Sequence, residues 1–258
     1  EEVIDLLQRS GEPARRTLPA AEWASNADQD EVSIDAGGVS LQGTLTVPRE
    51  AKGVILFVHG SGSSRHSPRN RRVAGILQSH GFATLLFDLL TQDEEDLDQK
   101  SAELRFDIDL LTKRLVGATH WIAKHASTAA LSIGYFGAST GAAAALAAAA
   151  FLRDRVAAIV SRGGRPDLAA DALGKVRAPV LLLVGGKDEM VITLNRYALD
   201  RLQSPVKHLA IIPGATHLFE EPGKLDQVAA MASDWFARYL VPDRSEKAAG
   251  HTRVSGAR

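Results

Sequence analysis

The pattern of hydrophobic and polar residues changes after Pro48. Before it, residues 39–47 (VSLQGTLTV) alternate between apolar and polar side chains, and EVSIDAG just upstream has the same character. Such alternation is typical of a strand with one buried face, so we expect an antiparallel hairpin. Beyond Pro48, short unbroken apolar runs are typical of parallel strands covered on both faces. They are GVILFVHG (53–60), FATLLFDLL (82–90), LSIGYFG (131–137), VAAIVSRGG (156–164), APVLLLVGG (178–186) and HLAIIPG (208–214).

Segments with helical periodicity lie between these runs. We expect helices at roughly 70–80, 104–125, 141–152, 193–203 and 224–239. Alternating strands and helices predict a doubly wound α/β domain, with an eight-stranded, mostly parallel sheet and helices on both faces. Only about 18 residues separate the strand at 156–160 from the strand at 179–184, so we expect no large cap domain and a site that is open or shallowly covered.

The chain divides into three parts by composition. We expect residues 29–241 to form the globular α/β domain. Residues 1–28 contain a short amphipathic segment followed by GEPARRTLPA, which predicts an N-terminal helix and a linker. Residues 242–258 are polar and aperiodic, which favours a disordered tail.

Composition narrows the classes of function. The 258 residues include no cysteine, which excludes disulfides, thiolate metal sites and a cysteine nucleophile. A formal net charge of −1 gives no indication of a nucleic-acid or membrane partner. No signal peptide and no run of ~20 apolar residues is present, so we expect a cytoplasmic protein. The sequence has neither metal-ligand spacing nor a nucleotide-binding glycine loop, and we predict no metal and no cofactor.

The segment GASTG, residues 137–141, joins an apolar run to an alanine-rich helix. A serine at such a turn takes an unfavourable backbone conformation, and side chains two positions before and after it would collide with their surroundings. Gly137 and Gly141 remove those side chains, and the first helical N–H groups point at the serine oxygen. Ser139 is therefore a candidate nucleophile, although a small turn residue is the alternative.

A serine hydroxyl needs a base, and the base needs an orienting acid. Ligand sites of doubly wound sheets lie beyond the carboxyl ends of the strands. Asp188 lies just past one downstream apolar run and His217 lies just past the next, which gives the order serine, acid, histidine. We predict Asp188 in preference to Glu189, because it comes first after the glycine turn. A surface carboxylate and a capping histidine are the alternatives.

An oxyanion formed at Ser139 needs backbone N–H donors. We predict the N–H of Thr140 and one N–H from the loop HGSGSS, with Ser61 first and Gly62 as the second choice. His59 is expected to brace that loop. For Asp88, which ends a strand at the same edge, a turn or capping role is favoured over catalysis.

Three arginines follow strands at this edge. Arg65, Arg162 and Arg165 could bind a substrate carboxylate or phosphate, or they could form ordinary salt bridges with neighbours such as the acidic run 91–103 (TQDEEDLDQKSAE). We expect that acidic run to be a solvated loop placed where it could cover the site.

Four segments carry a resemblance to a known family: ILFVHGSGSS, GYFGASTGAAAAL, LLLVGGKDE and IPGATHLFEEPG. Over residues 31–240 the chain resembles the α/β-hydrolase superfamily in its dienelactone-hydrolase-like branch, especially hydrolase domains that follow a phosphoribosyltransferase domain in some bacterial proteins. The resemblance implies ester hydrolysis through Ser139, Asp188 and His217. It also implies an upstream domain, with residues 1–28 as an inter-domain remnant. Dienelactone hydrolases proper use a cysteine nucleophile, so we do not expect dienelactone as the substrate.

We therefore expect a serine esterase for small-molecule esters that works through an acyl-enzyme. Transfer of the acyl group to another acceptor, or cleavage of a thioester or amide, would use the same residues. A hydrolase fold that serves only as an interaction module is the alternative from a different class.

Overall fold

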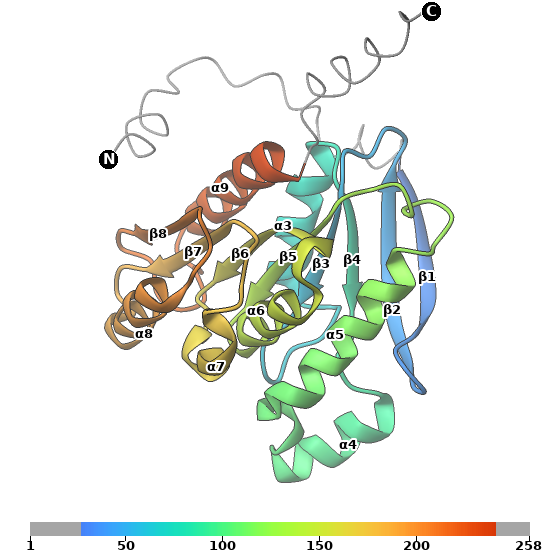
Figure 1. Cartoon of the computed structure of the whole chain (residues 1–258), viewed down its shortest axis with the longest axis horizontal. Coiled ribbons are helices and arrows are strands. Elements are labelled where there is room, and N and C mark those ends of the chain that lie inside the picture. The colour runs from blue at the N-terminus through green and yellow to red at the C-terminus, as the bar shows by residue number, and fades with distance from the viewer. Residues whose placement is uncertain (1–26, 241–258) are drawn as a thin grey trace, which may run out of the picture.

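The computed structural model describes residues 27–240 (Figure 1). The N-terminal helix and most of the linker expected within residues 1–28, and the tail expected at 242–258, lie outside the described residues. Among the described residues, no helix combines the length and the apolar character needed to cross a membrane.

A single eight-stranded sheet forms the centre of the domain, in the order β1-β2-β4-β3-β5-β6-β7-β8. β2 pairs antiparallel with β1 and β4, and every other neighbouring pair is parallel. The expected hairpin and the six later strands are confirmed. The strands are β1 (Ala27–Asp35), β2 (Ser40–Pro48), β3 (Val54–Val58), β4 (Ala83–Phe87), β5 (Ile133–Ala138), β6 (Val156–Arg162), β7 (Val180–Gly185) and β8 (Lys207–Ile212).

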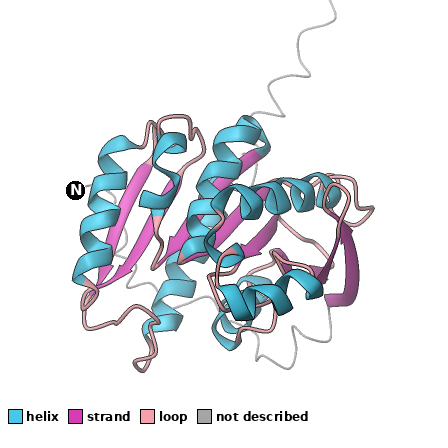
Figure 2. Cartoon of the chain, turned by 90° about the horizontal axis from the view of Figure 1, so that it is seen from below, coloured by secondary structure: helices cyan, strands magenta, loops and turns pink. Residues whose placement is uncertain are grey.

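Helices cover both faces of the sheet (Figure 2). One hydrophobic cluster joins α3 and α9 to one face, and a second joins α5, α6, α7 and α8 to the other. The helices are α3 (Pro68–Ser79), α4 (Gln92–Ser101), α5 (Ile108–Ile122), α6 (Thr140–Leu152), α7 (Ala170–Leu173), α8 (Glu189–Arg201) and α9 (Lys224–Tyr239), with short 3₁₀ turns at Leu104–Phe106, Arg153–Arg155 and Pro166–Ala169.

Each unbroken apolar strand contributes side chains to both hydrophobic clusters, because successive side chains point to opposite faces of the sheet. In β3, Val54 and Leu56 join the cluster under α5 and α6, whereas Ile55 and Phe57 join the cluster under α3 and α9. Because β3 and β5 to β8 run parallel, their carboxyl ends lie at one edge of the sheet, where the loops that carry the site begin.

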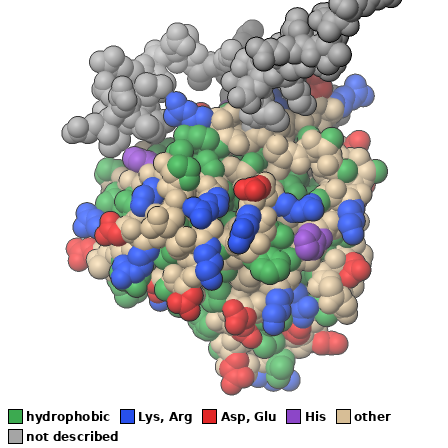
Figure 3. Space-filling model, in the orientation of Figure 1, with side chains coloured by type: hydrophobic (Ala, Val, Ile, Leu, Met, Phe, Trp, Pro, Cys, Tyr) green, Lys and Arg blue, Asp and Glu red, His purple; other side chains and the backbone are tan. Residues whose placement is uncertain are grey.

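The prediction of a solvated loop at 91–103 is wrong, because most of that segment is the helix α4. Thr91 and Glu94 form a capping box at its start, and Glu94 also pairs with Arg114 of α5 over 2.5 Å. The helix escaped detection because it has almost no apolar stripe, and Leu97 is exposed. Acidic side chains gather at the end of the molecule where α4 lies, whereas basic and acidic groups mix over the rest of this face (Figure 3).

Candidate active site

Ser139 stands between β5 and α6 in a conformation that L-residues rarely adopt, with φ 50° and ψ −122°. A Cβ added to Gly141 would lie 2.2 Å from the carbonyl oxygen of Val58, and one added to Gly137 would lie 2.6 Å from Cα of Ala142. The glycines are therefore required by contacts with the end of β3 and with the first turn of α6. The expected sharp strand-to-helix turn is confirmed, and its glycine spacing is explained by these two close backbone contacts.

Backbone hydrogen bonds connect the turn to the end of β6 and to the loop that follows it. The N–H of Ser139 donates to the carbonyl of Arg162, and the carbonyl of Ser139 accepts from the N–H of Arg165. Nearly all of α6 is buried, and its alanines let the helix lie close to the sheet. The side-chain oxygen of Ser139 forms no hydrogen bond with any described residue and opens onto a cavity.

Asp188 and His217 meet beyond the ends of β7 and β8. The Nδ1–H of His217 donates to Oδ2 of Asp188 over 2.6 Å. The aspartate side chain is 15% exposed and the histidine side chain 38% exposed, so the acid is shielded while the imidazole faces solvent. This bond leaves Nε2 of His217 as the free ring nitrogen and orients the ring from behind.

One cavity of about 230 Å³ brings four of the predicted site residues together, namely Ser61, Ser139, Arg162 and His217. Its lining consists of the loop after β3, the start of α3, the turn at Ser139, the end of β6 and the loop after β8. The residues are Gly60, Ser61, Ser63, Ser67, Arg69, Asn70, Ala138, Ser139, Arg162, His217 and Leu218. Asp188 stands behind His217 and is not part of the lining.

The loop after β3 lies directly against the turn at Ser139. A Cβ on Gly60 would come within 2.9 Å of the Cβ of Ser139, so only glycine allows this approach. The N–H of Ser61 donates to Oγ1 of Thr140 over 2.9 Å. The predicted loop donor is thus beside the serine, but in this structure its N–H is directed at the threonine side chain. Gly62, the second choice, has φ 66° and does not line the cavity.

His59 braces the loop, as expected. Its Nδ1–H donates to the carbonyl of Gly60 over 3.0 Å, and its Nε2 accepts the N–H of Leu89 over 3.1 Å. Burial lowers the pKa of His59, so the ring is neutral and this tautomer satisfies both nitrogens. Asp88 has the structural role that the sequence favours. Its carboxylate accepts the backbone N–H of Arg65 over 2.8 Å and also forms an ion pair with the guanidinium of Arg65.

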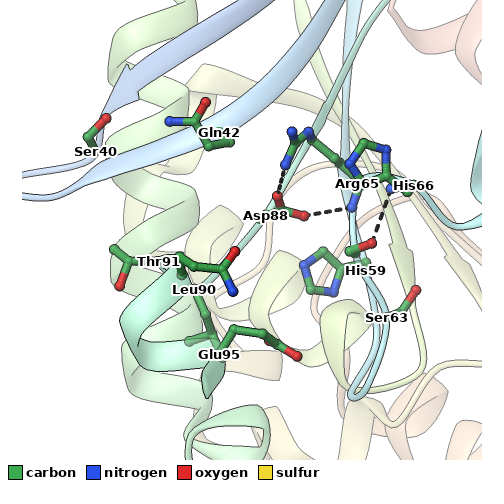
Figure 4. Close-up of a pocket in the computed structure, with 12 residues that line it drawn as sticks. Ser40, Gln42, His59, Ser63, Arg65, His66, Asp88, Leu90, Thr91 and Glu95 are labelled. Atoms are coloured by element: carbon green, nitrogen blue, oxygen red, sulfur yellow. Dashed lines mark hydrogen bonds and ion pairs between the residues drawn. The ribbon is translucent and has the colours of Figure 1, made fainter. Parts of the chain in front are cut away.

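The three arginines have different surroundings. Arg65 pairs with Asp88 and lines a second, larger cavity of about 580 Å³ between the loop after β3, β2 and the start of α4 (Figure 4). Arg165 forms a bidentate pair with Asp167 at 2.9 and 2.8 Å. Neither of them lines the cavity at Ser139. Only Arg162 does so, and it is 7% exposed.

The structure adds Arg69 and Asn70, which the sequence analysis did not single out. Both belong to the first turn of α3, and the side chain of Ser67 accepts the N–H of Asn70 at the helix start. The Ser-Pro pair that opens this helix was the available signal, because it predicts a helix start directly after the loop that follows β3.

Comparison with known proteins places the chain in a family. The family model for the "Dienelactone hydrolase family" matches residues 41–241. A crystal structure of dienelactone hydrolase from Anabaena variabilis is 57% identical, with a TM-score of 0.81, covering 83% of this chain and 99% of that one. Est1E from Butyrivibrio proteoclasticus, at 18% identity and a TM-score of 0.68 over 81% of this chain and 98% of its own, shares the fold.

Curated relatives are longer. A Mycobacterium tuberculosis H37Rv protein named "Putative phosphoribosyl transferase Rv0571c" is 56% identical over 244 residues, which are 93% of this chain and 53% of that protein. The chain therefore spans about half the length of the curated relatives it matches. Together with the eight-stranded sheet and the turn at Ser139, the family match shows that this chain belongs to the dienelactone hydrolase family.

Proposed function

We propose that the protein is a serine hydrolase that cleaves carboxylic esters through an acyl-enzyme. The observation that carries the proposal is the hydrogen bond of 2.6 Å from His217 to Asp188, with the imidazole lining the same cavity as Ser139. Membership of a hydrolase family agrees with this chemistry.

In the first step, Nε2 of His217 takes the proton of the Ser139 hydroxyl while Oγ attacks the ester carbonyl carbon. Asp188 stabilises the imidazolium that forms. The alcohol oxygen of the ester then takes the proton from His217 and leaves, and the acyl group stays on Ser139. Because Ser139 Oγ has no hydrogen-bond partner among the described residues, a small side-chain movement must bring it to His217.

In the second step, His217 takes a proton from water, and the hydroxide attacks the acyl-enzyme carbonyl. The carboxylic acid leaves as Ser139 regains its proton. The N–H of Thr140, at the start of α6, and the N–H of Ser61 are the donors we assign to the oxyanion of both steps.

We assign the phosphoribosyl transferase name of the curated relatives to the part of those proteins that this chain does not span. The matched part contains the hydrolase-family region, residues 41–241. Phosphoribosyl transfer by this chain is therefore not expected.

The test is covalent labelling of the intact protein with a fluorophosphonate, followed by peptide mass spectrometry and an assay with 4-nitrophenyl butyrate. We expect one adduct, on Ser139, and loss of esterase activity in proportion to labelling. Ser139→Ala and His217→Gln should reduce kcat at least about 1,000-fold while the fold is kept. The control is His66→Gln, an exposed histidine beside the other cavity, which should retain activity. Labelling at another residue, or full activity of Ser139→Ala, would refute the proposal.

A further inference from the structure

Arg162 is a buried cation without a counter-ion. It ends β6, is 7% exposed and lines the cavity at Ser139. Its polar contact is a long hydrogen bond of 3.4 Å from Nη2 to Oδ1 of Asn70, and its Nε has no partner. No carboxylate within residues 27–240 lies at ion-pair distance from it.

Other shielded arginines of the domain are neutralised. Arg65, Arg105, Arg114 and Arg165 each pair with an aspartate or a glutamate. A buried charge costs free energy unless an opposite charge or several hydrogen bonds compensate it. Arg162 is therefore an exception that needs a reason, and the cavity is the place where the missing anion could sit.

The surroundings of Arg162 increase the positive potential. Burial, and secondarily the nearby charge of Arg69, lowers the pKa of Arg162 to about 10, so its charge is retained at neutral pH but is destabilised. Arg69 lines the same cavity, but its guanidinium also pairs with Glu220 over 3.0 Å, so its charge is partly compensated, unlike that of Arg162. The N-terminus of α3 also reaches the cavity through Ser67 and Asn70, and a helix N-terminus favours negative charge.

We propose that Arg162, Arg69 and Asn70 form an anion-binding subsite beside Ser139, and that the preferred ester carries an ionised carboxylate. The inference rests on the proposed function and specifies its substrate class. A cavity of about 230 Å³ suits a half-ester of a short dicarboxylic acid. Water would add across the ester bond, the alcohol would leave with a proton, and the product would be a dicarboxylate with one end at Arg162.

The first experiment compares two esters of equal shape, monoethyl glutarate and ethyl 5-methylhexanoate, in which an isopropyl end replaces the carboxylate. We expect wild-type kcat/KM to favour the half-ester by about 10- to 100-fold, the range of a charge-assisted hydrogen bond. Arg162→Met should remove this preference, because kcat/KM for the half-ester should fall at least about 10-fold further than kcat/KM for the neutral ester. The control is Arg165→Met, on the same loop but paired with Asp167, which should keep the preference.

The second experiment measures binding without turnover. Glutarate is titrated calorimetrically into Ser139→Ala, with and without Arg162→Met, and we expect the second change to weaken binding at least about 10-fold. Inorganic phosphate is titrated in the same way, and tighter binding of phosphate than of glutarate would overturn the carboxylate assignment. If Arg162→Met does not fold, Arg162→Lys and Arg69→Gln replace it, with a smaller loss expected for each.

The two proposals fail separately. Hydrolysis of both esters at equal kcat/KM, with no binding of glutarate, would overturn the subsite and leave the hydrolase intact. An equal loss of preference in Arg165→Met would also overturn it. Binding of glutarate that depends on Arg162, with neither ester hydrolysed by the wild type, would support the subsite and count against the proposed function.

Discussion

The backbone N–H of Ser61 and the side-chain oxygen of Thr140 lie 2.9 Å apart, in hydrogen-bonding geometry. The bond ties the loop after β3 to the residue that follows Ser139, across 79 positions of sequence. It places the two backbone groups that we assign to the oxyanion beside each other. Thr140 is buried, so water cannot readily replace this contact, and the hydrogen bond holds the loop in place.

We expect Thr140→Val to lower kcat/KM for ester hydrolysis on the order of 10-fold, because the loop loses its attachment to the turn while the N–H of residue 140 is kept. Stability should fall by about 1 kcal/mol, since the N–H of Ser61 loses its acceptor. Kinetics and urea denaturation of the variant measure both effects. Thr140→Ser keeps the oxygen and should resemble the wild type. An increase of activity in Thr140→Val would mean that the threonine competes with the oxyanion for the N–H of Ser61.

Ser139→Gly should be inactive and yet more stable than Ser139→Ala by about 1 kcal/mol. The backbone at this position has φ 50°, a region that is strained for serine and alanine but open to glycine. The relief of strain is partly offset by the larger entropy of glycine in the unfolded chain. Chemical denaturation of the two inactive variants side by side gives the difference. Equal stability of the two would show that the turn stores no strain.

Gly141→Ala should lower the free energy of unfolding by about 3 kcal/mol or more, because the added carbon overpacks this turn, or it should prevent folding. The added carbon would lie 2.2 Å from the carbonyl oxygen of Val58, and neither backbone segment can give way. Gly174→Ala is the matched control, because a Cβ there would meet no atom within 4 Å. Thermal unfolding checks both variants, and a folded Gly141→Ala of wild-type stability would contradict the packing described for this turn.

The stability of the protein should fall as the pH drops below about 6.5, partly through His59. Burial lowers the pKa of this ring in the folded state, so below the ordinary histidine pKa the unfolded chain binds more protons than the folded one. The contribution is complete above that pH and is lost progressively below it. Urea denaturation between pH 5 and 7.5 should give a smaller slope for His59→Gln, in which an amide oxygen can still accept the N–H of Leu89. Equal slopes would exclude His59 as a source of the pH dependence.

Much of the fold could be predicted because its signals are local. Unbroken apolar runs need cover on both faces, so they predicted the parallel strands, and alternation predicted the β1–β2 hairpin. The helix α4 was missed because polar residues cover nearly its whole surface, and its signal was the Thr91–Glu94 capping box. Strand order was not predictable, because hydrogen bonding between distant strands leaves no mark on either segment alone.

The arginines show what only the tertiary structure decided. Arg65, Arg162 and Arg165 look alike in the sequence, each following a strand at the same edge of the sheet. Arg165 finds Asp167 two positions away, whereas Arg65 meets Asp88 only because β3 and β4 lie side by side. Arg162 is buried at the end of β6, where α3 contributes Arg69 and Asn70 to the same cavity, and no carboxylate of the described residues lies at ion-pair distance from it.

The sequence by itself determined the strands, most helices and the positions of Ser139, Asp188 and His217 at the ends of strands, because hydrophobic periodicity and glycine spacing act over a few residues. The tertiary structure decided which side chains share a cavity and which charges are neutralised. Those properties depend on contacts between segments far apart in the chain, and the free energy of a buried charge depends on every group around it.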